Sequence, residues 1–218
     1  MRIYDVSMTI HPRMAVWKRN QERLPVFTIE RDFDVDGTGS RQTRVSLDMH
    51  TGTHVDAPLH FLAHGSPIEN TGLDKLVRPV RVLDLTNVED KITRLDLENF
   101  RFGAGDFLLL KTKNSYVDEF DFEFVYLERT GAAYLVEREI AGVGIDALGI
   151  DRSQADHATH KQLLSNEIVI IEGLRLGDVP AGDYFMVALP LKLQGVEAAP
   201  ARVILFGVPE NEGAAQER

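Results

Sequence analysis

The chain has 218 residues, and its 24 Lys and Arg against 34 Asp and Glu give a formal net charge of −10. This acidic balance argues against a nucleic-acid partner, which needs a clustered basic surface. The chain contains no cysteine, which excludes disulfides, thiolate nucleophiles and cysteine-ligated metals, so His, Asp and Glu remain as the good protein metal ligands.

The length and the ordinary globular composition predict one folded domain, residues 1–209, followed by a polar tail at residues 210–218. The first residues, MRIYDVSMTI, lack the basic start and apolar run of a secretion signal. No stretch of ~18 apolar residues is present that could cross a bilayer. We therefore expect a cytoplasmic protein with no membrane partner.

Short apolar or β-branched runs, bounded by turn residues, recur along the chain. In Thr43–Met49 polar and apolar side chains alternate, which predicts a half-buried strand. Before it, the turn signal Asp36-Gly37-Thr38-Gly39 separates two such runs. The predicted strands are Arg2–Met8, Val26–Phe33, Thr43–Met49, Val80–Leu85, Phe107–Lys111, Gly142–Ile145, Ile168–Glu172, Tyr184–Leu189 and Ala201–Phe206.

Helical signals are fewer than strand signals. Asp96–Phe100 is a short candidate helix, Ala132–Ile140 is amphipathic with Thr130 as its expected N-cap, and Ser153–Leu164 reads as a loop followed by a helix. Many strands with a few interspersed helices predict an α/β fold with a mixed sheet, in an order too irregular for a doubly wound fold.

The most informative stretch, HTGTHVDAPLH, begins at His50 and continues through His54 and Asp56 to His60. These side chains stand at even offsets, so an extended chain would place them on one side, whereas a helix would scatter them. A helix is also disfavoured by the glycine at position 52 and the proline at position 58. We therefore place this cluster on a strand end and loop.

Two imidazoles and one carboxylate that converge on a point suit a divalent first-row metal. The alternative is that the stretch is a polar turn or a loop that stabilises an oxyanion.

A second polar cluster contains Asp156, His157 and His160, and Glu172 follows at the end of a continuously apolar strand. A carboxylate at that position is costly to bury alone, so it should meet a cation or a metal. The alternative is a solvated helix start at Asp156 and His157, with Glu172 facing water at the strand terminus.

The stretch HTGTHVDAPLH resembles the signature of the cyclase-like metal-dependent hydrolases, the family that includes bacterial kynurenine formamidases and isatin hydrolases. The segments IYDVSMTI, DHATHKQLL, IIEGLRLGDVPAGDYFMVALPLKL and AAPARVIL, together with Trp17, fall in the order expected for that family. The resemblance implies a swivelling β/β/α fold, with residues 1–209 forming one cyclase-like hydrolase domain.

The resemblance also implies a centre of one or two divalent ions, with zinc expected and manganese as the alternative. His60 matches the family's general base or proton shuttle, and His157 matches no ligand. Isatin hydrolases carry an amide where Glu172 stands, and an anionic ligand favours two ions. The implied metal ligands are His50, His54, Asp56, His160 and Glu172.

The expected activity is hydrolysis of a C–N bond in a small amide by metal-activated water, as in an arylformamidase that converts N-formylkynurenine to kynurenine and formate in tryptophan catabolism. Trp17 and Phe61 are the expected substrate-binding wall, although Phe61 could equally belong to the core. The alternatives are a hydrolase of a cyclic amide, imide or lactone, and a non-catalytic metal- or ligand-binding module. The family resemblance suggests a homo-oligomer, a dimer or a tetramer.

Two segments depart from the formamidase pattern and leave the substrate open. The surroundings of Trp17, MAVWKRNQE, lack the proline- and glycine-rich continuation of kynurenine formamidases. Where kynurenine formamidases have a leucine- and proline-containing segment before the second histidine, this chain has DHATH. Both departures leave in place the residues expected to hold the metal, including His160 at the end of DHATH.

Overall fold

An eight-stranded sheet dominates the computed structural model, which describes residues 2–33, 39–152, 154 and 156–207. The strands of the described chain are β1 (Ile3–Asp5), β2 (Val26–Arg31), β3 (Gln42–Ser46), β4 (His54–Asp56), β5 (Val77–Asp84), β6 (Lys91–Ile92), β7 (Phe107–Lys111), β8 (Tyr126–Leu127), β9 (Gly142–Ile145), β10 (Val169–Glu172), β11 (Gly182–Pro190) and β12 (Ala198–Gly207). The helices are α1 (Arg94–Leu97), α2 (Arg129–Glu137) and α3 (Ala158–Ser165).

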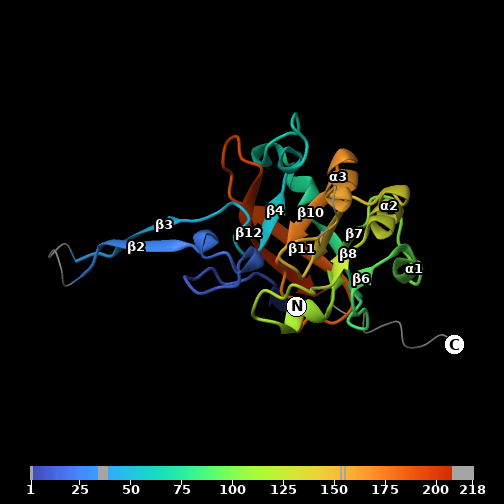
Figure 1. Cartoon of the computed structure of the whole chain (residues 1–218), viewed down its shortest axis with the longest axis horizontal. Helices are drawn as coiled ribbons and strands as arrows, with labels where there is room; N and C mark the ends of the chain where they lie inside the picture. Colours follow the sequence, from blue (N-terminus) through green and yellow to red (C-terminus); the bar gives the residue numbers. More distant parts are fainter. Residues whose placement is uncertain (1, 34–38, 153, 155, 208–218) are drawn as a thin grey trace.

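The large sheet runs in the order β1-β12-β11-β5-β7-β9-β10-β4, and it closes on itself because β4 also pairs with β12. Strands β5, β7, β9 and β10 are parallel neighbours, whereas the other pairs in this sheet are antiparallel. The helices lie together on one side of the sheet, in the connections between the parallel strands (Figure 1). The expected mixed sheet with few helices is therefore confirmed.

Each face of the sheet carries its own apolar core. Along β7, Phe107 and Leu109 point into the closed sheet, and Leu108 and Leu110 point toward the helices. The inner face is crowded, since a Cβ on Gly142 would lie 2.1 Å from the Phe107 ring. The alternation of side chains along a strand thus separates an inner core from an outer core beneath α2 and α3.

Strands β2 and β3 form a separate two-stranded arm that extends away from the body (Figure 1). The predicted strand is present as β3, but all residues of both strands are exposed, so the half-burial predicted for Thr43–Met49 is wrong. The alternating pattern is present, but no described segment of this chain covers the apolar face of the arm.

Helix α2 begins one turn earlier than the sequence predicts, and Thr130 is not its N-cap. The cap is Glu128, whose carboxylate accepts hydrogen bonds from the Thr130 backbone N–H at 2.8 Å and from its hydroxyl at 2.5 Å. Thr130 lies inside the first turn. A Thr130 cap would have accepted from the backbone N–H of Ala132 or Ala133, whereas Glu128 accepts from that of Thr130.

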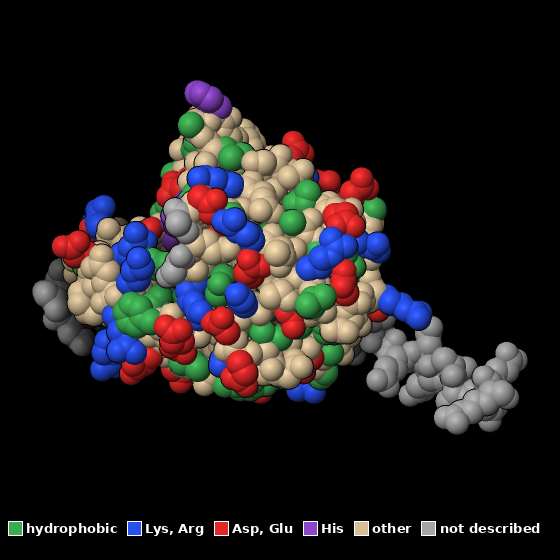
Figure 2. All heavy atoms as spheres, turned by 45° about the vertical axis from the view of Figure 1, so that its right-hand side comes forward, with side chains coloured by type: hydrophobic (Ala, Val, Ile, Leu, Met, Phe, Trp, Pro, Cys, Tyr) green, Lys and Arg blue, Asp and Glu red, His purple; other side chains and the backbone are tan. Residues whose placement is uncertain are grey.

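The predicted tail at 210–218, most of the turn signal at 36–39 and the start of the Ser153–Leu164 segment lie outside the described residues. None of the helices in the described part of the chain is both long and apolar enough to span a bilayer. On the face shown in Figure 2, acidic and basic side chains are interspersed.

Candidate metal centre

The antiparallel pairing of β4 with β10 brings three of the predicted ligands to one face of the sheet. His54 stands opposite Glu172, and Asp56 stands opposite Ile170. Because side chains alternate along a strand, Val55 between the two predicted ligands of β4 points into the inner core. His54, Asp56 and Glu172 therefore project together beneath α3, and all three are buried.

Helix α3 supplies His160 from above this face. Its Nε2 lies 3.1 Å from Oε1 of Glu172 and 3.7 Å from Oδ2 of Asp56. The side chain of His160 is 7% exposed, so its imidazole closes the site against solvent on that side.

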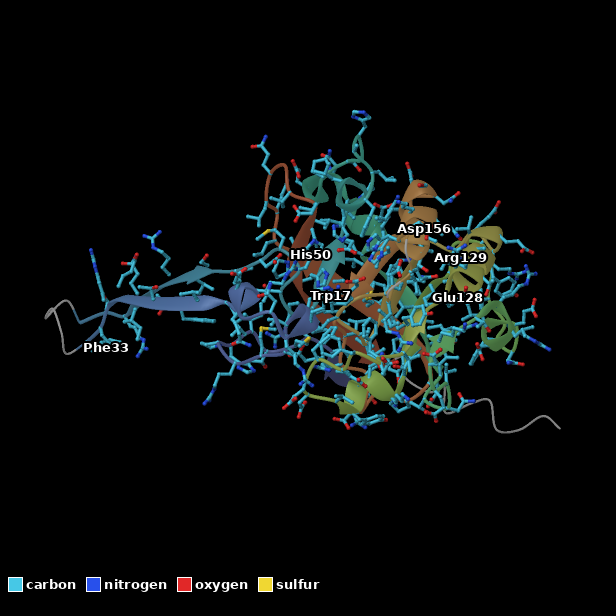
Figure 3. All side chains as sticks on the ribbon, in the orientation of Figure 1. Trp17, Phe33, His50, Glu128, Arg129 and Asp156 are labelled. Atoms are coloured by element: carbon cyan, nitrogen blue, oxygen red, sulfur yellow. The ribbon has the colours of Figure 1, made fainter. Side chains whose placement is uncertain are left out.

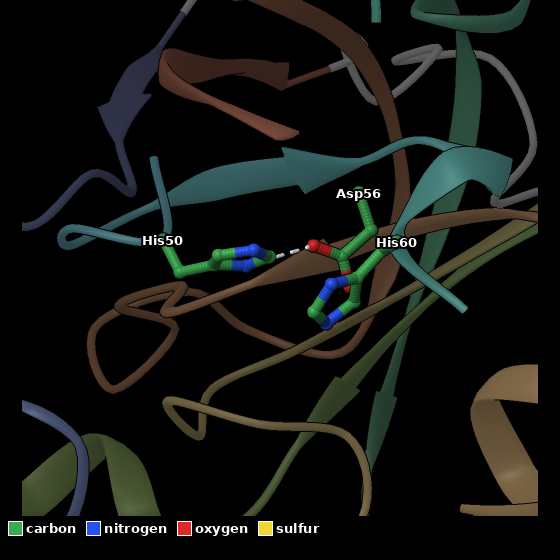
Figure 4. A group of neighbouring side chains, drawn as sticks. All are labelled: His50, Asp56 and His60. Carbon is green, nitrogen blue, oxygen red and sulfur yellow. Dashed lines mark ion pairs between the residues drawn. The ribbon is translucent and has the colours of Figure 1, made fainter. Parts of the chain in front are cut away.

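His50 and His60 approach Asp56 from loops on either side of β4 (Figure 4). Nδ1 of His50 lies 3.2 Å from Oδ1 of Asp56, and the rings of His50 and His60 are 4.2 Å apart. The extended arrangement expected for the whole stretch holds only for His54–Asp56. The chain turns at Gly52, where φ is +66°, and again in the 3-10 turn Pro58–His60.

Backbone contacts fix the orientation of two of these side chains. Nδ1 of His54 lies 2.9 Å from the carbonyl oxygen of Gly52, which directs Nε2 toward the carboxylates. Oε1 of Glu172 accepts a 2.6 Å hydrogen bond from the backbone N–H of Ile150. The facing atoms of the cluster are therefore held in place by the fold.

The donor set fits a divalent cation. Nε2 of His54 and both carboxylate oxygens of Asp56 are buried without a hydrogen-bond partner in the described structure. Nε2 of His54 lies 3.2 Å from Oε2 of Glu172 and 3.5 Å from Oδ1 of Asp56. Buried polar atoms are normally paired, so an unpaired set of nitrogen and oxygen atoms facing one another indicates a metal site.

Two groups of side chains in this cluster could each hold an ion, and they share Asp56. One group is His54, Asp56 and Glu172, and the other is His50, Asp56 and His60. A carboxylate has two oxygens, so Asp56 can contact both positions at once.

The electrostatics separate the imidazoles into two kinds. Burial disfavours the charged form of His54 and of His160, but the adjoining carboxylates outweigh it and raise the pKa of His54 to about 9 and that of His160 to about 10. Burial dominates at His60 and lowers its pKa to about 4. In the metal-free protein His60 is therefore the neutral imidazole, able to accept a proton.

A cavity of about 440 Å³ opens onto this cluster. Trp17 and Phe61 both line it, and both also pack against the outer core. Figure 3 places Trp17 and His50 near the base of the arm, with Phe33 far out along it. Three further aromatic side chains that sequence reasoning did not single out line the same cavity, namely Phe120, Phe122 and Phe124.

Sequence reasoning also missed two carboxylates at the site. Glu197 lies 3.5 Å from Nε2 of His50, and Asp151 lies 3.6 Å from Nδ1 of His160. Asp151 follows the largely apolar segment that contains β9, much as Glu172 ends β10, and this similarity is the signal that could have found it. His157 is exposed, although it could form a ligand group with Asp151 and His160.

Comparison with known proteins agrees with this geometry. The Cyclase family model matches residues 4–152. A kynurenine formamidase from Salinibacter ruber is 34% identical over 213 residues, which cover 96% of this chain and 100% of the relative. A solved structure described as a potential metal-dependent hydrolase with cyclase activity is 49% identical, covers 94% of this chain and 96% of its own, and superposes with a TM-score of 0.87.

Isatin hydrolase A from Labrenzia aggregata superposes with a TM-score of 0.82 over 94% of this chain and 93% of its own, at 24% identity. At that identity the likeness shows a common fold.

Proposed function

The chain belongs to the Cyclase family and is a metal-dependent hydrolase, and from this premise we propose that it is an arylformamidase-like enzyme that hydrolyses the C–N bond of a small aryl amide. The observation that carries the proposal is the convergence of imidazole and carboxylate side chains from β4, β10 and α3 beside an aromatic cavity. Within this cluster, Nε2 of His54 and both carboxylate oxygens of Asp56 have no hydrogen-bond partner in the described structure. N-formylkynurenine is the proposed substrate, with kynurenine and formate as products, because the curated relative is named a kynurenine formamidase. This reaction would place the enzyme in tryptophan catabolism.

We propose that the site holds two divalent ions that share Asp56. The anionic ligand Glu172 supports two ions over one, because it offsets more cationic charge than an amide does. Zinc is the expected metal and manganese the alternative, since nitrogen and oxygen ligands accept both. The proposed ligands are His50, His54, Asp56, His160 and Glu172.

A divalent ion bound here would lower the pKa of a water molecule to about 7 and polarise the amide carbonyl. His60 then has the properties of the proton-transfer group. It is neutral at pH 7 because burial lowers its pKa to about 4, and its ring lies 4.2 Å from that of His50. We assign to it the acceptance of a proton from the attacking water and the transfer of that proton to the leaving nitrogen, so that the products are a carboxylate and an amine.

We propose that Trp17 and Phe61 bind the aryl group of the substrate. Both line the cavity that opens onto the metal ligands, and their flat faces suit a planar ring. The same aromatic cavity would accept the fused ring of a cyclic amide or imide, which keeps that substrate class as the second candidate.

We further propose that the protein acts in the cytoplasm as a homo-oligomer, a dimer or a tetramer, without a nucleic-acid or membrane partner. The exposed apolar side chains of the β2–β3 arm support self-association. The net charge of −10 argues against binding to nucleic acid.

The test is metal content per chain, measured by elemental analysis on protein purified without a chelator, together with hydrolysis of a substrate panel. The panel contains N-formylkynurenine, isatin and a simple lactone, each assayed before and after metal removal and after restoration with zinc or manganese. The proposal expects two equivalents of metal and metal-dependent turnover of N-formylkynurenine. If only isatin is hydrolysed in a metal-dependent manner, the substrate class is a cyclic amide instead. If the purified protein contains no metal, the proposed metal centre is refuted.

A further inference from the structure

Asp151 is a buried carboxylate on the segment between β9 and α3, outside the proposed set of metal ligands. It is 4% exposed, and its Oδ2 lies 3.6 Å from Nδ1 of His160. Neither of these two atoms has a hydrogen-bond partner in the described part of the chain. Two buried, unpaired polar atoms therefore face each other just beyond hydrogen-bond length.

The other oxygen of Asp151 is held by a short polar network. Nε2 of Gln154 donates to Oδ1 of Asp151 at 3.0 Å and to the hydroxyl of Thr159 at 2.8 Å. The Thr159 hydroxyl in turn donates to the carbonyl oxygen of Leu127 at 2.8 Å. The carboxylate is thus positioned by its own loop and by α3, independently of the metal ligands.

The imidazole of His160 presents its two nitrogens to different partners. Nε2 faces Glu172 and Asp56, at 3.1 and 3.7 Å, whereas Nδ1 faces Asp151. A neutral imidazole carries one N–H, and a carboxylate beside Nδ1 favours the tautomer with the proton there. That tautomer leaves a lone pair on Nε2, the nitrogen that faces the rest of the site.

We propose that Asp151 is a positioning residue that accepts the Nδ1–H of His160 and so fixes the ring orientation and tautomer in which Nε2 ligates the metal. The proposal rests on the proposed metal site, because Asp151 acts only through His160. Outer carboxylates of this kind contribute about 10–100-fold to metal affinity.

The test compares wild-type protein with Asp151→Asn, which keeps the size of the side chain and removes its charge. Metal-free protein is titrated with Zn²⁺ against a chelator, and the visible absorption spectrum of the Co²⁺-loaded protein is recorded. We expect Zn²⁺ affinity to fall by about 10–100-fold, with a changed Co²⁺ spectrum because the ligand ring is no longer held. If Asp151→Asn does not fold, Gln154→Ala loosens the carboxylate without removing it, and a smaller loss of affinity is expected.

Two matched variants separate this role from general effects on the fold. Asp146 is also buried, but its carboxylate accepts hydrogen bonds from the hydroxyls of Thr112 and Ser115. The variant Asp146→Asn should therefore destabilise the fold and leave Zn²⁺ affinity unchanged. His157→Ala removes the exposed neighbour of the same cluster, and Zn²⁺ affinity and stoichiometry should both stay at wild-type values.

Unchanged affinity and spectrum in a folded Asp151→Asn variant would overturn the proposal while leaving the metal site intact. If His157→Ala and Asp151→Asn each lowered the Zn²⁺ stoichiometry by one equivalent, the two residues would be ligands of an ion of their own, which also overturns it. A wild-type protein that binds no Zn²⁺ would refute the proposed centre, and this inference with it.

Discussion

His54 and Glu172 are register partners in the antiparallel pair formed by β4 and β10, and Nε2 of His54 lies 3.2 Å from Oε2 of Glu172. The strand pairing itself therefore joins two segments that are distant in the sequence. A shift of one residue in this register would turn either His54 and Asp56 together, or Glu172, toward the inner core. The candidate metal centre and the closure of the sheet thus depend on the same backbone hydrogen bonds.

We predict that His60→Ala lowers kcat for the metal-loaded enzyme by about 10²–10⁴-fold, the usual contribution of a positioned proton-transfer group. Zinc content and thermal stability should change little, because the five other side chains that converge on the site remain. The control is His64→Ala, an exposed histidine in the same loop, which should keep wild-type activity. Loss of zinc in His60→Ala would instead identify His60 as a metal ligand. This outcome is possible because His50, Asp56 and His60 lie close enough to hold an ion together.

We predict that metal binding releases protons and strengthens as the pH rises. Since the carboxylates raise the pKa of His54 to about 9 and that of His160 to about 10, both imidazoles are protonated in the metal-free protein at neutral pH. A metal must displace those protons, so apparent affinity should rise by about 10–100-fold per pH unit below pH 9. Calorimetry in buffers of different ionisation enthalpy measures the proton count directly, and a count of zero would contradict the protonation states derived from the structure.

The two chemically informative stretches could be found from the sequence because they contain imidazoles and carboxylates at short spacings. His50, His54, Asp56 and His60 lie within one continuous segment. Sequence spacing could not reveal that Asp151 faces His160 on the side away from the metal ligands. That contact depends on how the segment after β9 folds back over α3, which is a tertiary relationship.

The positions of strands could be predicted where the pattern of apolar side chains indicates burial. The arrangement of strands was less predictable, because it depends on which distant strands pair. Phe107–Lys111 and Gly142–Ile145 are strands at the predicted boundaries, because parallel strands buried on both faces are continuously apolar. The closure of the sheet through β4 and β12 depends on pairing between distant segments, and no local pattern encodes it. In Thr43–Met49 the local pattern is itself insufficient, because the alternation of side chains predicts an apolar face but does not show whether another segment covers it.

We predict that Gly173→Ala damages the metal centre as well as the fold. Gly173 follows Glu172 with φ at +68°, and an added Cβ would lie 2.5 Å from the carbonyl oxygen of Gly52. The left-handed backbone alone costs an alanine about 1–2 kcal/mol. The contact with Gly52 should in addition push apart the ends of β4 and β10 that carry His54 and Glu172.

Gly195→Ala is the matched control for that variant. Its φ is +77°, and no atom lies within 4 Å of the added Cβ, so it carries only the backbone cost. Urea unfolding should show a lower free energy of unfolding for both variants, with the larger decrease for Gly173→Ala. Zinc affinity should fall only for Gly173→Ala. Equal zinc affinity in the two variants would show that the Gly52 loop adjusts without moving the ligands.

We predict that the β2–β3 arm carries a contact between copies of the chain. Phe27 and Ile29 share one face of the arm with Val45, and these side chains are 40%, 50% and 41% exposed. An isolated two-stranded ribbon is at best marginally stable in water, so burial of this face against a second copy would stabilise the arm. The double variant Phe27→Asp with Ile29→Asp should therefore shift the protein toward monomer in light scattering coupled to size-exclusion chromatography.

The opposite face of the same arm offers the control for this prediction. Thr28 is exposed between Phe27 and Ile29, and its side chain points away from them because side chains alternate along β2. Thr28→Asp adds a charge at the same distance from the body without entering the apolar face, so the oligomeric state should be unchanged. If the double variant keeps the mass of the wild type, the apolar face of the arm is not the contact. If Thr28→Asp dissociates the protein as much as the double variant does, then added charge anywhere on the arm causes dissociation, and the apolar face is not specifically the contact.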